Sequence, residues 1–170
     1  MDTPFIYGKL AVGENFTDRA EEKMRLVQNF ISGTNTILIS PRRWGKSSLV
    51  LKAASEVKDT SPNILVVFLD LFNIRSEEDF YKALAENVIR VSSGRMEEVI
   101  LTVKQFMKQW VPRISFSPDS QQEFSLGLNW NELKKQPDEI LDLAENIAQS
   151  KKSKLVICID EFQNIAFFED

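Results

Sequence analysis

The chain has 170 residues, of which 43% are hydrophobic and 27% are charged, and its formal net charge is −4. This composition is typical of one ordinary globular domain and excludes a disordered or a fibrous protein. The negative net charge argues against broad electrostatic binding to nucleic acid or to an anionic membrane. The chain has no histidine and only one cysteine, which excludes zinc sites, Ser-His-Asp triads and Cys-His dyads.

The first third of the chain predicts a helix, a strand and a second helix. Apolar residues recur at helical spacing over residues 18–31, and Gly33 is the expected stop. The short apolar run at residues 36–39 predicts the first strand. Residues 46–57 again place apolar side chains on one helical face.

The loop between this strand and the second helix has the sequence SPRRWGKSS at residues 40–48. Backbone N–H groups at a helix N-terminus, together with one lysine, can hold the dense negative charge of a triphosphate. Lys46 is the candidate lysine, and Ser47 is the candidate hydroxyl for Mg²⁺. The other predicted contacts of the loop with the nucleotide are Ser40, Pro41, Arg42, Arg43, Trp44, Gly45 and Ser48.

The loop departs from the strict phosphate-loop pattern at Ser40, where that pattern has glycine. Serine is the smallest substitute that still forms local hydrogen bonds, so we treat the change as tolerated. The alternative is an ordinary exposed loop with two arginines and a lysine. Trp44 is either a contact that shapes the loop or a surface aromatic residue.

The next two elements are a buried strand and a helix. Residues 64–69 form a run of apolar, mostly branched residues that is too short for a core helix. Residues 76–91 predict a helix with Ser76 as its cap and acidic residues in its first turn. Alternating strands and helices indicate a parallel α/β sheet. Asp70 is either an indirect partner of the nucleotide site or a turn residue, and we favour the turn.

Residues 95–150 are an insertion relative to a minimal nucleotide-binding core. They predict a helix over residues 96–110, a hairpin that joins 111–116 to 124–130, and a helix over 137–148. Four aromatic residues of this region are expected to cluster away from the nucleotide: Trp110, Phe116, Phe124 and Trp130. With Arg113 nearby they could stack on a partner or on nucleic acid, but we favour a small separate core.

The apolar run at residues 154–159 leads directly into Asp160 and Glu161. A central strand of a parallel sheet is apolar on both faces, and ligands collect at its carboxyl end. Asp160 would hold Mg²⁺ directly or through water, and Glu161 would orient or polarise the attacking water. The alternative is an exposed strand end followed by an acidic turn.

Cys158 lies within this apolar run and is expected to be a small core residue. A single cysteine allows no disulfide framework within the chain, which fits a reducing compartment. No stretch approaches the ~18 uninterrupted apolar residues of a membrane span, and the N-terminus lacks the basic start and apolar core of a signal peptide. We therefore expect a cytoplasmic protein without a membrane partner.

The loop at residues 41–49 and the strand end at residues 158–163 together resemble the prokaryotic and archaeal-type P-loop ATPases of the AAA+/STAND-like group. Residues 15–19, NFTDR, are similar to the short aromatic-plus-arginine motif that precedes the phosphate loop in that group and helps to enclose the adenine. This makes Phe16 a predicted cofactor contact. The three segments span most of the chain.

The resemblance implies ATP rather than GTP, together with Mg²⁺. It implies that Lys46 contacts the β- and γ-phosphates, that Ser47 and Asp160 bind the metal, and that Glu161 is the catalytic glutamate. The implied fold is α/β: a three-layer P-loop NTPase core with a parallel sheet that ends here after the Walker B strand, plus a mostly helical insertion.

We expect one apparently truncated ATPase domain over residues 1–170. Its parts are the adenine-side segment and helix at 1–33, the P-loop half of the core at 34–94, the insertion at 95–150 and the Walker B strand at 151–170. Relatives continue with a fourth strand, a sensor residue and an arginine finger. We therefore expect either a fragment or a chain whose sheet is completed by a homo-oligomer or a partner chain.

These observations predict ATP binding with Mg²⁺-dependent hydrolysis, and turnover that is slow or absent without the further elements. One alternative is a fragment that binds nucleotide without hydrolysis or is held by a partner through unpaired strand edges. Another is an ATPase that loads on DNA, which rests on family analogy alone and which the acidic net charge disfavours.

Overall fold

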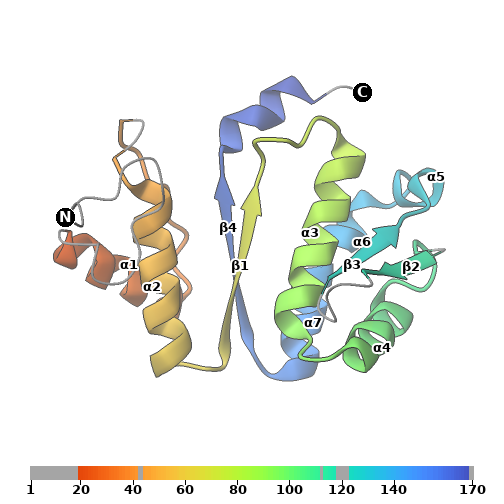
Figure 1. Ribbon diagram of the computed structural model, residues 1–170, viewed down its shortest axis with the longest axis horizontal. Helices are drawn as coiled ribbons and strands as arrows, with labels where there is room; N and C mark the ends of the chain where they lie inside the picture. The colour runs from red at the N-terminus through yellow and green to blue at the C-terminus, as the bar shows by residue number, and fades with distance from the viewer. Residues whose placement is uncertain (1–18, 42–43, 112, 118–122, 169–170) are drawn as a thin grey trace, which may run out of the picture. The chain divides into compact units, whose positions relative to one another are not determined.

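The computed structural model describes residues 19–41, 44–111, 113–117 and 123–168 (Figure 1). The chain divides into two compact units, Met1–Ile64 and Leu65–Asp170, and each is described by itself.

In the first unit, helix α1 (Ala20–Ser32) packs against helix α2 (Lys46–Thr60). Each helix buries one apolar face, because its apolar residues recur at helical spacing. The buried side chains of α1 are Leu26, Val27 and Phe30, and the buried apolar ones of α2 are Leu49, Ala53, Ala54 and Val57. Both predicted helices are confirmed.

Gly33 ends α1, as predicted. Its backbone is left-handed, with φ 75° and ψ 29°, and its N–H donates to the Asn29 carbonyl. Glycine has no Cβ and adopts this conformation without strain, so it is the residue that most readily closes a helix in this way.

The predicted first strand at residues 36–39 is wrong for this structure, which assigns no strand to the described residues 34–41. The side chains of Ile37 and Ile39 are 86% and 92% exposed. A strand is stable only when its backbone groups pair with a neighbouring strand. Among the described residues before Ile64, none belongs to a strand that could provide this pairing.

The second unit contains a small sheet of two strands, β1 (Ile64–Asp70) and β4 (Lys154–Asp160). The two arrows run in the same direction, so the pair is parallel (Figure 1). Parallel strands need a long crossover, and here it is provided by the helices and the hairpin between Glu77 and Lys151. Both predicted strands and their parallel pairing are confirmed.

The crossover begins with helix α3 (Glu77–Ser92) and helix α4 (Met96–Phe106). The hairpin of β2 (Arg113–Phe116) and β3 (Phe124–Gly127) follows, with Ile114 opposite Leu126 in the antiparallel register. The remaining elements are α5 (Trp130–Leu133), α6 (Pro137–Leu141), α7 (Leu143–Lys151) and, after β4, the short 3₁₀ helix η2 (Phe162–Phe167).

Two predicted helices of this region are corrected. The first ends at Phe106 instead of Trp110, because Met107 leaves the helical conformation at φ −130°. The second is two helices, α6 and α7, which meet at Asp142. Helical periodicity does not detect such a break, because α6 and α7 both bury apolar side chains.

The aromatic residues of the insertion belong to the main core of the second unit instead of a separate cluster. Trp110 and Phe124 are each 6% exposed, in one contiguous core with Val67 and Leu69 of β1. Trp130 is partly buried and packs against the same core, with its ring centroid 6.0 Å from that of Tyr81 of α3. Buried rings at Trp110 and Phe124 are unavailable for stacking on a base.

Ser76 caps α3 as predicted, since its hydroxyl oxygen accepts a hydrogen bond from the Asp79 N–H at 3.1 Å. We expect Ser76→Ala to lower the free energy of unfolding by about 1 kcal/mol, because the first turn loses this partner for an N–H group. Urea denaturation measures the change. Ser76→Asn keeps a capping oxygen and should retain most of the stability, so an equal loss in both variants would contradict the capping role.

No helix among the described residues is long and apolar enough to cross a membrane.

Candidate functional site

The loop of the first unit runs directly into the N-terminus of α2, which begins at Lys46. Gly45 has a left-handed backbone with φ 70° and ψ 26°, and its carbonyl accepts the Leu49 N–H at 2.9 Å. A Cβ placed on Gly45 would meet nothing within 4 Å. The requirement for glycine here is therefore conformational and does not come from crowding.

The side chain of Lys46 folds back over this loop. Its Nζ donates to the Ser40 carbonyl at 3.1 Å and to the Pro41 carbonyl at 3.3 Å. The ammonium group thus lies at the start of the loop, while its own backbone begins α2. A positive charge and the N-terminal end of a helix, with its partial positive charge, are combined in one short segment, and this combination suits an anion.

The serines of the loop have different surroundings. Ser47 is half-buried in the first turn of α2, whereas Ser48 is only 4% exposed and lies on the buried face. Of these two, Ser47 is therefore better placed to present its hydroxyl to a ligand. The Ser40 hydroxyl oxygen is buried and, within the described part of the chain, has no hydrogen-bond partner.

Trp44 is an exposed residue, 66% of which is accessible. Its backbone carbonyl accepts a hydrogen bond from Arg19 Nη1 at 2.9 Å. The ring is thus a surface aromatic group, and the contribution of Trp44 to the shape of the loop comes from its carbonyl. Phe16, Arg42 and Arg43, also predicted to contact the nucleotide, lie outside the described residues.

Arg19 precedes α1 and has a left-handed backbone with φ 72° and ψ 36°. For a residue with a Cβ this conformation costs roughly 1–2 kcal/mol. Besides Trp44, its guanidinium group contacts Glu22, with Nε 3.1 Å from Oε1. Sequence reasoning placed Arg19 in the NFTDR motif but did not predict its contact with the loop 25 residues away.

In the second unit, Asp160 ends β4 and Glu161 follows it. Asp160 Oδ1 accepts the Glu161 N–H at 2.9 Å, and the Asp160 carbonyl accepts the Leu71 N–H at 3.1 Å. These bonds fix both the side chain and the backbone of Asp160 beside the end of β1. Glu161 has a left-handed backbone with φ 53°, and its Oε2 accepts a hydrogen bond from Gln163 Nε2.

Asn164 ties the turn after β4 to the end of β1. Its Nδ2 donates to the Leu71 carbonyl at 3.0 Å, and its N–H donates to the Glu161 carbonyl at 2.9 Å. Sequence reasoning missed this residue, because a single asparagine after a strand carries no signal that identifies its partner. Asn164 thus holds the backbone that carries Glu161.

Asp70 shows the local role that we favoured from the sequence, whereas Cys158 is only half-buried and lies outside the buried core, so its predicted place as a small core residue is wrong. Asp70 Oδ1 accepts the Phe72 N–H at 2.9 Å, which makes Asp70 the turn residue at the end of β1. Burial raises the pKa of the Cys158 thiol to about 11. Cys158 therefore stays protonated at neutral pH and is a poor nucleophile.

The family assignment follows from a comparison with known proteins. A family model described as "Predicted AAA-ATPase" matches residues 18–168. The chain belongs to this family. The match confirms the resemblance inferred from the loop and from the strand end, and it spans both the Lys46 segment and the Asp160 segment. No curated protein and no solved structure matches the chain.

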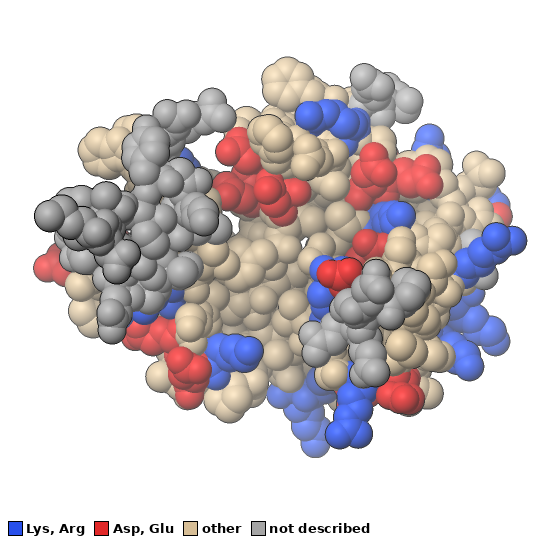
Figure 2. Space-filling model, in the orientation of Figure 1, with Lys and Arg blue, Asp and Glu red and all other residues tan. Residues whose placement is uncertain are grey.

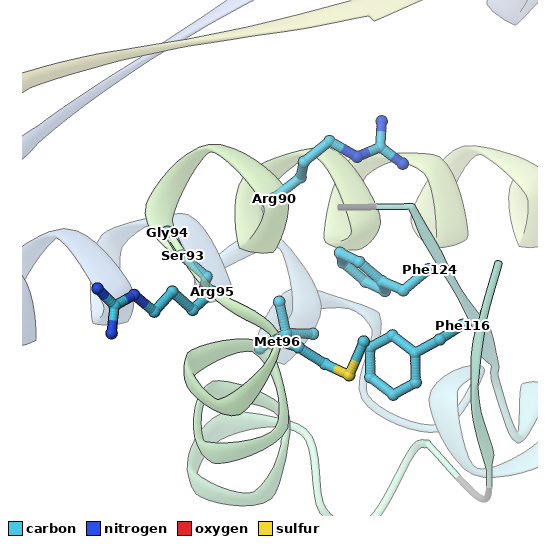
Figure 3. Close-up of a pocket in the computed structure, with 8 residues that line it drawn as sticks. Arg90, Ser93, Gly94, Arg95, Met96, Phe116 and Phe124 are labelled. Carbon is cyan, nitrogen blue, oxygen red and sulfur yellow. The ribbon is translucent and has the colours of Figure 1, made fainter. Parts of the chain in front are cut away.

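A cavity of this AAA-ATPase family member lies in the second unit, and none of the predicted site residues lines it. It encloses about 130 Å³ between the end of α3, the start of α4 and the hairpin. Met96, Phe116 and Phe124 point toward one another there, whereas the guanidinium group of Arg95 extends away (Figure 3). Arg90 lies over the Phe124 ring, 5.8 Å from its centroid. The lining is thus mixed, with apolar side chains beside two arginines and a serine, and it contains no carboxylate that could act as a general base.

On the face that Figure 2 presents, acidic and basic side chains of the described residues are interspersed, and no continuous basic surface is seen on that face. No group of three or more His, Cys, Asp or Glu residues in the described part of the chain could hold a metal ion by itself. A metal held by one serine, one aspartate and phosphate oxygens would not form such a group.

Proposed function

We propose that the chain binds ATP with Mg²⁺ and hydrolyses it as an AAA-ATPase module. The observation that carries this proposal is the segment at the start of α2, where the left-handed Gly45, the folded-back Lys46 ammonium and the helix N-terminus occur together. Membership of the predicted AAA-ATPase family supports it. The three-layer P-loop core is part of the proposal, with β1 and β4 as two of its parallel strands.

The binding step uses charge and backbone N–H groups. Lys46 would leave the carbonyls of Ser40 and Pro41 and contact the β- and γ-phosphates, which are stronger acceptors because they are ionised. The N–H groups in the first turn of α2 face the N-terminal end of the helix and would donate to phosphate oxygens. Adenine would lie on the side of Phe16.

The chemical step uses the end of β4. Mg²⁺, when bound, neutralises charge on the phosphates. Ser47 and Asp160 would hold it, and both suit it because a hydroxyl and a carboxylate are hard oxygen ligands. One oxygen of Asp160 already accepts the Glu161 N–H, which orients the carboxylate. Glu161 would accept the proton of the attacking water or orient it.

The test of this proposal is calorimetric titration of the wild-type chain with ATP, once in Mg²⁺ and once in EDTA. We expect tighter binding in Mg²⁺. Ser47→Ala should weaken binding in Mg²⁺ by roughly tenfold or more, since even indirect partners of a metal change its affinity by that much, and should have little effect in EDTA.

Ser55→Ala is the matched control, because Ser55 is exposed on the same helix. It should bind like the wild type in both solutions. A folded wild-type chain that binds no ATP in either solution would overturn the proposed function.

A second candidate is a module that binds ATP but hydrolyses it only after another chain, or a second copy, extends its sheet. Ile157 and Ile159 of β4 are 38% and 37% exposed, although they lie on a strand of the sheet. A further strand pairs through backbone groups at a sheet edge, and among the described residues this sheet has only two strands, so its outer edges could accept one, while an added element could cover the exposed isoleucines. Sedimentation equilibrium that shows a monomer at all concentrations would contradict assembly from copies of this chain.

A further inference from the structure

Two hydrogen bonds hold the peptide groups on either side of Gly45. Arg19 Nη1 donates to the Trp44 carbonyl, and the Leu49 N–H donates to the Gly45 carbonyl, each at 2.9 Å. A trans peptide is planar, and its N–H points away from its C=O. Because the Trp44 carbonyl faces Arg19, the Gly45 N–H is directed away from Arg19. The side chain of Arg19 therefore sets the direction of one loop N–H group.

Arg19 is itself held firmly at the start of α1. Its carbonyl accepts the Lys23 N–H at 3.0 Å, and its Nε lies 3.1 Å from Glu22 Oε1. The planar guanidinium group can direct one N–H to the carboxylate and another to the carbonyl at the same time. The strained backbone of Arg19, at φ 72°, starts the helix from which this side chain reaches Trp44.

We propose that Arg19 is a positioning residue of the nucleotide site, which holds the Trp44 carbonyl so that the Gly45 N–H stays directed toward phosphate. The inference rests on the proposed function and deepens it. It differs from the role in enclosing adenine that the resemblance implies for residues 15–19, because the contact in the structure is with the backbone of the loop. Arg19 acts through Gly45 and takes no part in the chemical step.

The experiment compares Arg19→Gly, Arg19→Lys and a control, Arg25→Ala. Glycine adopts φ 72° without strain, so Arg19→Gly removes the side chain and leaves the start of α1 intact. Arg25 is exposed on the same helix, and its removal changes the net charge equally. Hydrogen–deuterium exchange of the amides of residues 45–47 reports the order of the loop, and calorimetry with ATP and Mg²⁺ reports affinity.

We expect Arg19→Gly to exchange the amides of residues 45–47 faster and to raise the Kd for ATP by roughly ten- to 100-fold, as for loss of one hydrogen bond from a charged donor. Arg19→Lys keeps one donor without the planar fork and should give intermediate values for both. Arg25→Ala should match the wild type.

Two results would overturn the proposal. Unchanged exchange and unchanged Kd in Arg19→Gly would show that the contact has no role. A raised Kd with unchanged exchange would show that Arg19 contacts the nucleotide directly. A wild-type chain that binds no ATP would overturn the proposed function instead, while faster exchange in Arg19→Gly would still support the tether between Arg19 and the loop.

Discussion

Lys46→Ala is expected to raise the Kd for ATP by roughly 100- to 4,000-fold. The ammonium group would donate to oxygens of two phosphates, and two hydrogen bonds between charged groups contribute about 3–5 kcal/mol together, at about 1.4 kcal/mol per tenfold change. Alanine leaves the phosphate charge without this partner and is a good residue at a helix start. Calorimetric titration in Mg²⁺ measures the loss.

Lys58→Ala is the control for this experiment, because Lys58 is exposed in the last turn of the same helix and carries the same charge. It should bind ATP like the wild type. Circular dichroism of Lys46→Ala shows whether α2 still forms, since Lys46 also contacts the carbonyls of Ser40 and Pro41. A folded Lys46→Ala variant with wild-type affinity would remove Lys46 from the nucleotide site.

Glu161→Gln is expected to lower the rate of phosphate release by about 10²–10³-fold and to leave the affinity for ATP essentially unchanged. The amide cannot accept a proton from water, and loss of a general base typically costs this much. Glutamine has nearly the same shape, and its amide oxygen can still accept the hydrogen bond from Gln163. A single-turnover assay with protein in excess over ATP measures release, because slow turnover is expected.

Glu97→Gln is the control for a change of net charge, because it also replaces one glutamate by glutamine, at an exposed position on α4. This variant should release phosphate like the wild type. Equal release by the wild type and Glu161→Gln would exclude Glu161 as the catalytic glutamate. Weaker binding by Glu161→Gln would instead indicate that Glu161 takes part in holding the nucleotide or its metal.

Much of the secondary structure could be predicted from the sequence because it depends on local patterns. The periodicity that predicted the first two helices also describes their buried faces, and Ser76 and Gly33 mark helix ends through their own backbone and side-chain chemistry. The run at residues 36–39 has the same apolar character as the run in β4, yet only the latter is a strand here. Pairing with a neighbour decides between them, and the sequence does not specify the neighbour.

In the candidate site, too, local sequence motifs pointed to some residues, whereas other contacts became known only from the structure. Lys46 and Ser47 could be predicted because glycine, lysine and serine are adjacent in one loop, and Asp160 and Glu161 because they end an apolar run. Arg19 and Asn164 could not be assigned their contacts, since each reaches a backbone carbonyl far along the chain. All backbone carbonyls are chemically alike, so the type of the donating side chain does not identify which carbonyl it will contact.

The sequence by itself indicated the family of this chain and most of its helices and strands, and it named the residues proposed to bind phosphate, metal and water. The tertiary structure alone decided that Arg19 holds the Trp44 carbonyl, that the backbone of Leu71 pairs with Asp160, and that the aromatic residues Trp110 and Phe124 belong to the main core. The physical reason is that motifs and periodicity arise from neighbouring residues, whereas these contacts exist only once distant segments pack against one another.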